Sequence, residues 1–308
     1  DMPAEDALAA IVRRSLEHML ANDPAALAGD AEGVHQMRVA LRRLRATLGL
    51  FKTLIPDAQR AQATAEMKWL ADALGAARNW DIFAVLAAPV QQALPEDGDL
   101  AALLRAVEEK RRAAYAAMRE VMTSARYTDM VLRLMEWVEM RGWRQQQVSE
   151  TSVLLLSPVG DLADGLVEKR YRKARKLAKR FAALDAAGRH ELRIALKKLR
   201  YGADSFEPMY PAKAAARMAK RVSGLQGDLG LLNDVTTAQE LMGDLPAATE
   251  AGEDLRRGAT IMQGWLARMV AENERRLSRE VARFLEAKPF WKRSKKRRGD
   301  VEPIAAGE

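Results

Sequence analysis

The sequence predicts an all-α protein built from two pseudo-symmetric halves, related by an internal duplication, with a basic cleft between them. Three observations predict this class. Ala, Leu, Arg and Glu, which keep most of their side-chain freedom in a helix, dominate a chain of 308 residues with only 6% aromatic residues. Helical periodicity runs through almost the whole chain. Only residues 152–156 form a short apolar run typical of a strand. The string HQMRVALRRLR at 35–45 returns as HELRIALKKLR at 190–200.

The apolar spacing divides the chain into a series of expected helices, separated by turn residues that are mostly prolines. In chain order the expected helices cover residues 4–21, 31–54, 57–77, 80–94, 98–124, 127–145, 159–184, 188–207, 211–230, 232–244 and 249–286. Polar residues and a proline interrupt the pattern near 145–158. We therefore expect a first half over residues 1–156, a second half over 157–291 and a basic tail over 292–308.

The repeat extends beyond the two strings. A shift of 155 positions lays Phe206 over Phe51 and Leu229-Gly230 over Leu74-Gly75. We expect turns at the two Leu-Gly pairs. Asp81 and Asp234 follow these pairs at roughly matching places, where capping a helix or orienting an arginine is favoured over binding a divalent ion. Two equal helical halves packed face to face create a groove between them.

Each string places its basic residues on one helix face, opposite the apolar stripe. The first row consists of His35, Arg38, Arg42 and Arg45, and the second of His190, Arg193, Lys197 and Arg200, with Tyr201 beside them. Stacked cations repel each other by a few tenths of a kcal/mol per pair. No acidic residue interrupts the first row, and Asp204 is a possible partner of Arg200 in the second. Carboxylates of other helices or a bound polyanion must supply the missing charge, and arginines suit bidentate phosphate contacts.

A further basic strip is expected on the helix that precedes the second string. Its members, which share one face without an intervening acid, are Lys169, Arg172, Lys173 and Lys176. The corresponding segment of the first half, around Arg14 and His18, is far less basic, and His18 is interpreted as a packed residue. The second half is therefore expected to carry more of the binding.

Composition argues against several other classes of protein. The chain has no cysteine, and two histidines without neighbouring carboxylates make a poor zinc site, so we expect no metal and no cofactor. Neither a phosphate-binding glycine loop nor a His-Glu-x-x-His motif is present, and no catalytic residue is predicted. The formal charge of +8 is modest. No signal peptide and no apolar run long enough for a membrane are found.

The two His-x-x-Arg strings, each followed by Leu-Gly and an Asn/Asp cluster, resemble the CHAD family, the conserved-histidine α-helical domains. The resemblance covers about residues 5–286. It implies two four-helix-type bundles around a basic central cavity, binding of inorganic polyphosphate by the two rows, and a cytoplasmic protein found in some members on polyphosphate granules. Residues 78–81 read Arg-Asn-Trp-Asp where the family often has Arg-Asp-x-Asp, which favours a structural role here.

Two other functions remain open. Nucleic acid shares the electrostatics of polyphosphate, although the six tryptophans are scattered rather than spaced for base stacking. CHAD domains also commonly follow a CYTH triphosphatase domain, so the chain is alternatively the accessory half of such an enzyme. By itself the chain is predicted to be non-enzymatic, and its oligomeric state is left open.

Overall fold

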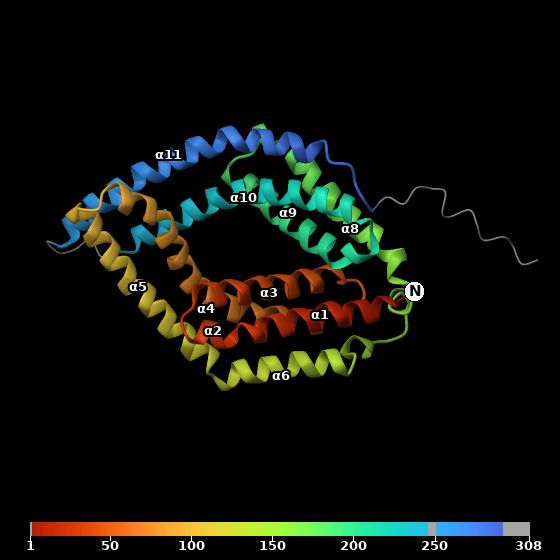
Figure 1. Cartoon of the computed structure of the whole chain (residues 1–308). Coiled ribbons are helices and arrows are strands. Elements are labelled where there is room, and N and C mark those ends of the chain that lie inside the picture. The colour runs from red at the N-terminus through yellow and green to blue at the C-terminus, as the bar shows by residue number, and fades with distance from the viewer. Residues whose placement is uncertain (1, 246–250, 292–308) are drawn as a thin grey trace, which may run out of the picture.

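A computed structural model of the chain describes residues 2–245 and 251–291, and within them it forms helices and no strand (Figure 1). The all-α prediction is therefore confirmed. The longer helices are α1 (Ala4–Ala21), α3 (Ala31–Leu50), α4 (Asp57–Ala93), α5 (Gly98–Met122), α6 (Ala125–Glu139), α8 (Val159–Ala178), α9 (Ala186–Phe206), α10 (Ala212–Gly243) and α11 (Ala251–Leu285). Short elements are α2 (Asp23–Leu27), α7 (Glu150–Val153) and the 3-10 turns η1 (Gly142–Arg144), η2 (Phe181–Ala183) and η3 (Glu207–Met209). The predicted basic tail lies outside the described residues.

Two predicted helix breaks are wrong. The expected helices 57–77 and 80–94 form the single helix α4, and 211–230 and 232–244 form the single helix α10. The Leu-Gly pairs therefore lie inside helices and not in turns. A glycine costs a helix only about 1 kcal/mol relative to alanine, which tertiary packing of both long helices offsets. The run 152–156 also contains no strand, because residues 152 and 153 belong to α7 and residues 154–156 form a turn.

Aspartates begin the two helices that carry the repeated string. The Asp30 carboxylate accepts hydrogen bonds from the backbone N–H groups of Glu32 and Gly33 at the start of α3. At the start of α9, Asp185 accepts one from Gly188 at 2.8 Å. Such N-caps satisfy backbone donors that have no partner within the helix. They fix where each helix begins, and so fix the face that His35 and His190 occupy.

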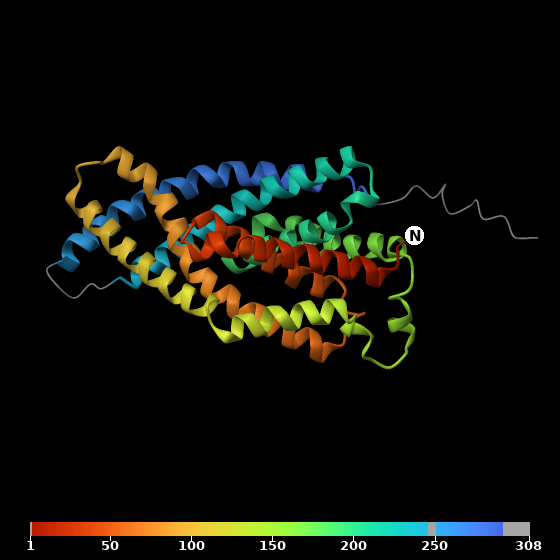
Figure 2. The ribbon, with the colours of Figure 1, turned by 60° about the horizontal axis from the view of Figure 1, so that its bottom comes forward.

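The helices of the two halves pack in the same order along the chain. In the first half α1 packs on α3, α3 on α4 and α4 on α5, and in the second half α8, α9, α10 and α11 follow the same order. The helix α6 packs on α1, and within the residues described up to 291 no further helix follows α11 (Figures 1 and 2). The common order agrees with an internal duplication, which stays a prediction.

Both hydrophobic cores contain side chains of both halves. The larger core unites α1, α3 and α6 with α8 and α9, and includes the fully buried Leu41 and Leu196. The second core lies where the C-terminal parts of α4 and α10 meet the N-terminal parts of α5 and α11, on the left of Figures 1 and 2. There Phe83 and Leu103 of the first half are buried with Met262 of the second. The predicted division at residue 156 is thus crossed by apolar packing at two places.

The helices α3 and α9 converge toward their C-terminal ends. Phe51 and Phe206, which the repeat superimposes, touch edge to face with ring centroids 6.2 Å apart. Beside them the Arg170 guanidinium of α8 donates a hydrogen bond to the Gly49 carbonyl at 2.8 Å. Contact between repeat-related residues is what a pseudo-twofold arrangement of the halves produces. The convergence brings the basic faces of α3 and α9 toward each other.

Candidate functional site

Side chains of both repeated strings meet between α3 and α9. The Arg42 Nε donates a hydrogen bond to the Tyr201 hydroxyl at 3.1 Å. Lys197, the repeat equivalent of Arg42, lies within electrostatic reach of Arg42, Arg38 and Arg193. The middle members of the two predicted rows therefore face one another rather than pointing apart into solvent.

We call this assembly the central cluster. It consists of charged or titratable side chains of α3, α4, α9 and α10 that act electrostatically on one another, and of the tyrosine that is hydrogen-bonded to Arg42. Its members are His35, Arg38, Arg42, Arg78, Arg193, Lys197, Tyr201 and Asp234. Asp234 is the carboxylate of this set, and the neighbouring Glu32 and Asp72 also act on His35 and on Arg38, respectively. Among the described residues, the cations of the central cluster form a single ion pair, between Arg78 and Asp81 at 3.9 Å. The cluster therefore holds an excess of positive charge with little internal neutralisation.

Arg38 is held against α4 by a backbone contact. Its Nη1 donates a hydrogen bond to the Ala71 carbonyl at 2.9 Å. A Cβ atom at Gly75 would lie 2.6 Å from that nitrogen, so the glycine provides the space for the guanidinium. Burial, followed by the charges of Arg42 and Arg78, lowers the pKa of Arg38 to about 10. The side chain stays charged at neutral pH, at a cost in free energy that a bound anion would offset.

Lys197 lies in a more unfavourable position for a charge. Burial is the largest effect on it, and the charges of Arg193 and Arg42 add to it. Together they lower the pKa of Lys197 to about 7. A perturbation of this size on a group between other cations is typical of functional sites. At neutral pH the lysine of the empty protein is protonated only about half of the time.

Arg193 and Asp234 face each other without a close ion pair. Burial raises the pKa of Asp234, while Arg193 and Lys197 oppose that rise. The Arg193 Nε is buried and has no hydrogen-bond partner. Buried nitrogens of Arg60, Arg141 and Arg189 share this property, so the Arg193 Nε is a donor available to a ligand or solvent atom rather than a mark of a ligand site.

His35 occupies the end of the cluster nearest the start of α3. Burial, and then the charge of Arg78, lower its pKa from the ordinary value, while Glu32 opposes them. Desolvation is the larger of these effects. The imidazole is therefore mostly neutral at pH 7 in the empty protein.

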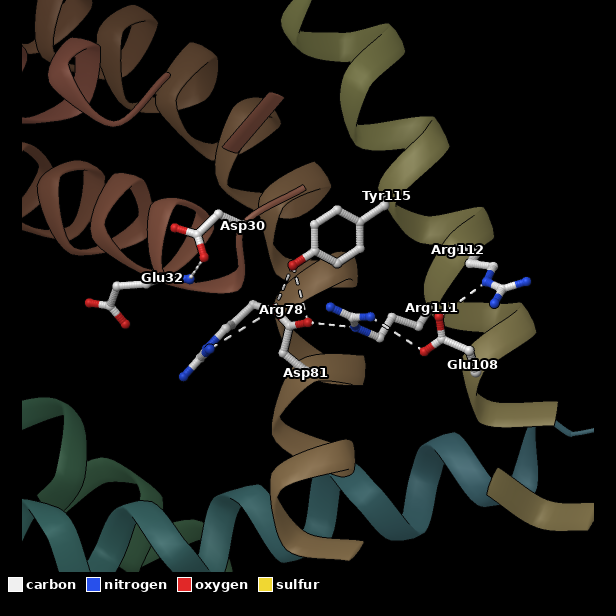
Figure 3. A network of polar contacts seen from close by, with 8 residues as sticks. All are labelled: Asp30, Glu32, Arg78, Asp81, Glu108, Arg111, Arg112 and Tyr115. Atoms are coloured by element: carbon white, nitrogen blue, oxygen red, sulfur yellow. Dashed lines mark hydrogen bonds and ion pairs between the residues drawn. The ribbon is translucent and has the colours of Figure 1, made fainter. Parts of the chain in front are cut away.

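Arg78 enters the cluster from α4 and is supported by a second network (Figure 3). The buried Asp81 carboxylate accepts hydrogen bonds from the Tyr115 hydroxyl, at 2.9 Å and 3.1 Å, and from the Arg111 Nε at 2.8 Å. Burial and Asp81 raise the pKa of Tyr115 to about 12, so the phenol remains a donor. Asp81 lies mid-helix and caps nothing. It instead orients arginines, the other of the two structural roles expected from the sequence.

A cavity of about 930 Å³ borders the central cluster on the side of the second half. Its wall includes His190 and Arg193 of α9, Asn233 of α10 and Glu274 of α11. Arg189 also lines it and pairs with Glu274. His190 is exposed at this cavity rather than in the cluster. A linear anion on Arg193 could thus continue into open space beside the histidine.

A second cavity, of about 640 Å³, lies on the other side of Tyr201. It is lined by Arg14 and His18 of α1, Arg43 of α3 and Asp204 of α9. His18, interpreted from the sequence as a packed residue, is only half-buried and lies 3.4 Å from Arg43 between Nδ1 and Nη1. The wall of this second cavity carries both basic and acidic side chains, which distinguishes the cavity from the central cluster.

Other predicted contacts lie outside the central cluster. Arg45 is exposed, and Arg200 stacks over the Tyr201 ring at 5.3 Å. The expected ion pair of Arg200 with Asp204 is not formed within the described residues.

The basic strip of α8 also differs from expectation. It was expected to be free of acid, but Arg172 pairs with Glu168 at 2.7 Å and Lys173 with Glu191 at 2.9 Å. Glu168 lies on α8 itself, one turn before Arg172, and the wheel could have shown it, whereas Glu191 comes from α9, which no single-helix wheel contains. Lys169 and Lys176 are exposed. Whether any of these residues binds a ligand stays a prediction.

Sequence reasoning missed Arg78 and the role of Asp234 in the cluster. Arg78 stands in the segment 78–81 that was compared with the family pattern, but the expected turn at Leu74-Gly75 separated it from the helix that faces α3. A continuous α4 would have placed Arg78 one turn after Gly75, on the same side as the Arg38 contact. The error in the helix boundary therefore hid the residue.

No group of three metal-ligating side chains is present in the described parts of the chain. Over the same residues, none of the helices has both the length and the apolar character of a membrane span.

Comparisons with known proteins agree with this fold. The crystal structure of the CHAD domain from the plant Ricinus communis has a TM-score of 0.77 and 28% identity, over 94% of this chain and 93% of that one. PptA from Streptomyces chartreusis has a TM-score of 0.61 over 93% of this chain and 99% of its own, and its 16% identity speaks for the fold alone.

Two curated relatives come from Mycobacterium tuberculosis. The uncharacterised protein Rv2226 of strain ATCC 25618 / H37Rv is 29% identical over 261 residues, and the uncharacterised protein MT2285 of strain CDC 1551 / Oshkosh is 28% identical over the same length. These matches cover 82% of this chain but 48% of each relative, so the chain spans about half of their length. The family description "CHAD domain" matches residues 10–243, which include both repeated strings and every member of the central cluster. This chain therefore belongs to the CHAD domain family.

Proposed function

We propose that this chain is a non-catalytic module that binds inorganic polyphosphate, and that the central cluster holds the phosphate chain. The observation that carries the proposal is the meeting of Arg38, Arg42, Arg193 and Lys197 in a half-buried site with Asp234 as the one carboxylate among them. Buried cations without a carboxylate partner cost free energy, and this cost supports a ligand that brings its own negative charge.

The chemistry of the side chains favours phosphate over other anions. Guanidinium groups make bidentate contacts to phosphate oxygens, and the cluster contains arginines from three helices. These helices are fixed by their packing in a common core, so the cations are pre-organised and little ordering cost remains for binding. A flexible linear anion can follow the cluster into the neighbouring cavity at His190 and Arg193.

Nucleic acid is a weaker candidate for the same site. Tyr201 is the one aromatic member of the cluster, and its ring is buried with its hydroxyl bonded to Arg42. It therefore offers no exposed face on which a base could stack. A duplex also carries its phosphates on a wide surface, whereas these cations are half-buried between helices.

A competition experiment tests the proposal. We expect long-chain polyphosphate to displace fluorescent single- or double-stranded DNA from the protein at a phosphate concentration at least about tenfold below that at which DNA displaces polyphosphate. The affinity for polyphosphate should also fall steeply with salt, because several counterions are released together. If DNA is the stronger competitor at matched phosphate concentration, the proposed ligand is wrong.

The wider role of the protein is also part of this proposal. Because the curated relatives are about twice as long, we propose that in such proteins a CHAD module supplies binding while the remaining chain supplies any catalysis, as in a CYTH–CHAD triphosphatase. Incubating this chain with magnesium and polyphosphate should then release no phosphate above background. Sustained turnover would contradict the non-catalytic assignment. We place the module in the cytoplasm, on polyphosphate granules where these are present.

The space provided by Gly75 gives a specific prediction. The substitution Gly75→Ala puts a Cβ 2.6 Å from the Arg38 Nη1 and forces the guanidinium away from the Ala71 carbonyl. We expect polyphosphate affinity to fall by about tenfold, the effect of one charge-assisted contact. Gly230→Ala, at the repeat-equivalent position on α10, is the matched control because its Cβ would meet open space. That control should leave affinity unchanged, and equal losses in both variants would contradict the role of Gly75.

A further inference from the structure

The surroundings of Lys197 carry an inference that rests on the proposed function. Lys197 is half-buried on α9, one turn after Arg193 and one turn before Tyr201, whose hydroxyl accepts the hydrogen bond from Arg42 of α3. Arg38 of α3 and Asp234 of α10 also act on this lysine. From α4, Arg78 acts on Asp234 and on His35. On α8, which also packs against α9, Lys173 is paired with Glu191. Three cations therefore oppose one carboxylate at the ammonium group.

Lysine differs from its neighbours in how it can respond to this environment. An arginine starts from so high a pKa that it stays protonated near neutral pH even where burial lowers that pKa, as at Arg38, whereas a lysine in the same surroundings can lose its proton. Within the central cluster, Lys197 is thus the strongly basic side chain that can relieve the repulsion by becoming neutral. A polyanion placed among the same groups reverses the balance and favours the charged ammonium.

We propose that polyphosphate binding at the central cluster is coupled to the uptake of a proton by Lys197, so that binding weakens as the pH rises above neutrality. In the step, the neutral amine takes one proton from the solvent and becomes an ammonium that donates hydrogen bonds to phosphate oxygens. No bond to phosphorus is made or broken. The lysine therefore acts as a pH-dependent component of a site whose arginines are permanently charged.

The sign and the window follow from the two states of the lysine. The pKa of Lys197 is about 7 in the empty protein and moves back toward its ordinary value of 10.5 when an anion is bound. Between these values the bound state holds more protons than the empty one. The affinity therefore falls with increasing pH, by up to about tenfold per pH unit for one proton. Below about pH 6 the lysine is charged in both states and contributes no dependence.

The other titratable members of the cluster act in a more acidic range. Burial and Arg78 lower the pKa of His35 from 6.5, and a bound polyanion raises it again. The pKa of Asp234 is raised from 3.8 by burial, and a polyanion would raise it further. Proton uptake by these groups is expected mainly near and below neutral pH. Measurements at pH 8.5 therefore report chiefly on Lys197.

Calorimetry tests the coupling directly. Titration of the protein with long-chain polyphosphate at pH 8.5 in two buffers of different ionisation enthalpy, such as Tris and HEPES, gives the number of protons exchanged per site. Long chains minimise the contribution of their own terminal phosphates, and phosphate buffer is avoided because it competes. We expect an uptake approaching about one proton per site at pH 8.5. Binding without measurable uptake would overturn the inference.

Three variants separate a proton-linked lysine from a merely structural one. Lys197→Met should weaken binding by about tenfold or more at pH 6 and take up no proton at pH 8.5. Lys197→Arg should rescue binding with its charge and make the affinity nearly independent of pH between 8 and 9, above the range in which His35 titrates. Lys198→Arg, at the exposed next position on α9, is the matched control and should keep the uptake of the original protein.

The outcomes also distinguish this inference from the proposed function. If Lys197→Arg takes up as many protons as the unchanged protein, another group titrates and the inference is wrong, although polyphosphate binding stands. If no form of the protein binds polyphosphate at any pH, the proposed function itself fails.

Discussion

The double substitution Arg42→Glu with Lys197→Glu is expected to abolish binding of long-chain polyphosphate while the protein remains folded. These residues are equivalent in the repeat and act on each other in the middle of the central cluster. Each replacement removes a charge-assisted contact of about 1.5–3 kcal/mol and adds a repulsive charge. The affinity should therefore fall by about a thousandfold or more, as measured by fluorescence anisotropy at constant salt. Circular dichroism checks the fold.

Two further double variants show whether position or net charge is responsible. Arg105→Glu with Lys110→Glu makes the same change in charge at exposed positions of α5 and should lower affinity only slightly. Lys169→Glu with Lys176→Glu tests the α8 strip that the sequence assigns to binding. Full-strength binding by the Arg42/Lys197 variant would contradict the assignment of the central cluster. Equal losses in all three variants would show that net charge alone attracts the ligand.

Among the substitutions proposed here, removing the ring of Phe206 is expected to lower the free energy of unfolding most. Phe206 and Phe51 are almost completely buried, at 1% and 0% exposure, and they join the C-terminal ends of α3 and α9. Phe206→Ala should lower the free energy of unfolding by about 3–5 kcal/mol, because it leaves a cavity in the shared core. Urea denaturation measures the change. Polyphosphate affinity should also fall, since the two basic faces would no longer be held together.

A comparison with Leu132→Ala provides the control for this variant. Leu132 is 60% exposed on α6, so its truncation should change stability by less than about 0.5 kcal/mol. The double variant Phe51→Ala with Phe206→Ala should be less destabilised than the sum of the two single variants, because the pair contact is lost only once. Strict additivity would show that the two rings do not stabilise each other.

The fold class and the basic faces of α3 and α9 could be predicted from the sequence because they depend on helical periodicity alone. The wheel of each string places its cations opposite the residues that become buried, such as Leu41 and Leu196. The same local argument failed at Gly75 and Gly230, where it expected turns. Glycine is a weak signal inside a long helix, and the packing that keeps α4 and α10 continuous is contributed by distant segments.

The membership of the central cluster depended on how the helices are arranged in space. Arg42 and Lys197 could be proposed from the repeat, but the convergence of α3 and α9 and the exposure of Arg45 and His190 could not. Likewise, the acid that pairs with Lys173 comes from α9, and no single-helix pattern contains it. Burial, which is the largest cause of the lowered pKa of Lys197, is a property of the assembled molecule.

The sharing of both cores has a consequence for any attempt to dissect the molecule. A fragment ending near residue 156 would present Phe83 and Leu103 to water, because Met262 and its neighbours on α11 would be absent. It would also retain only those members of the central cluster that lie on α3 and α4. Since both cores combine side chains of the two repeated segments, we expect a fragment of either segment to be much less stable than the whole chain.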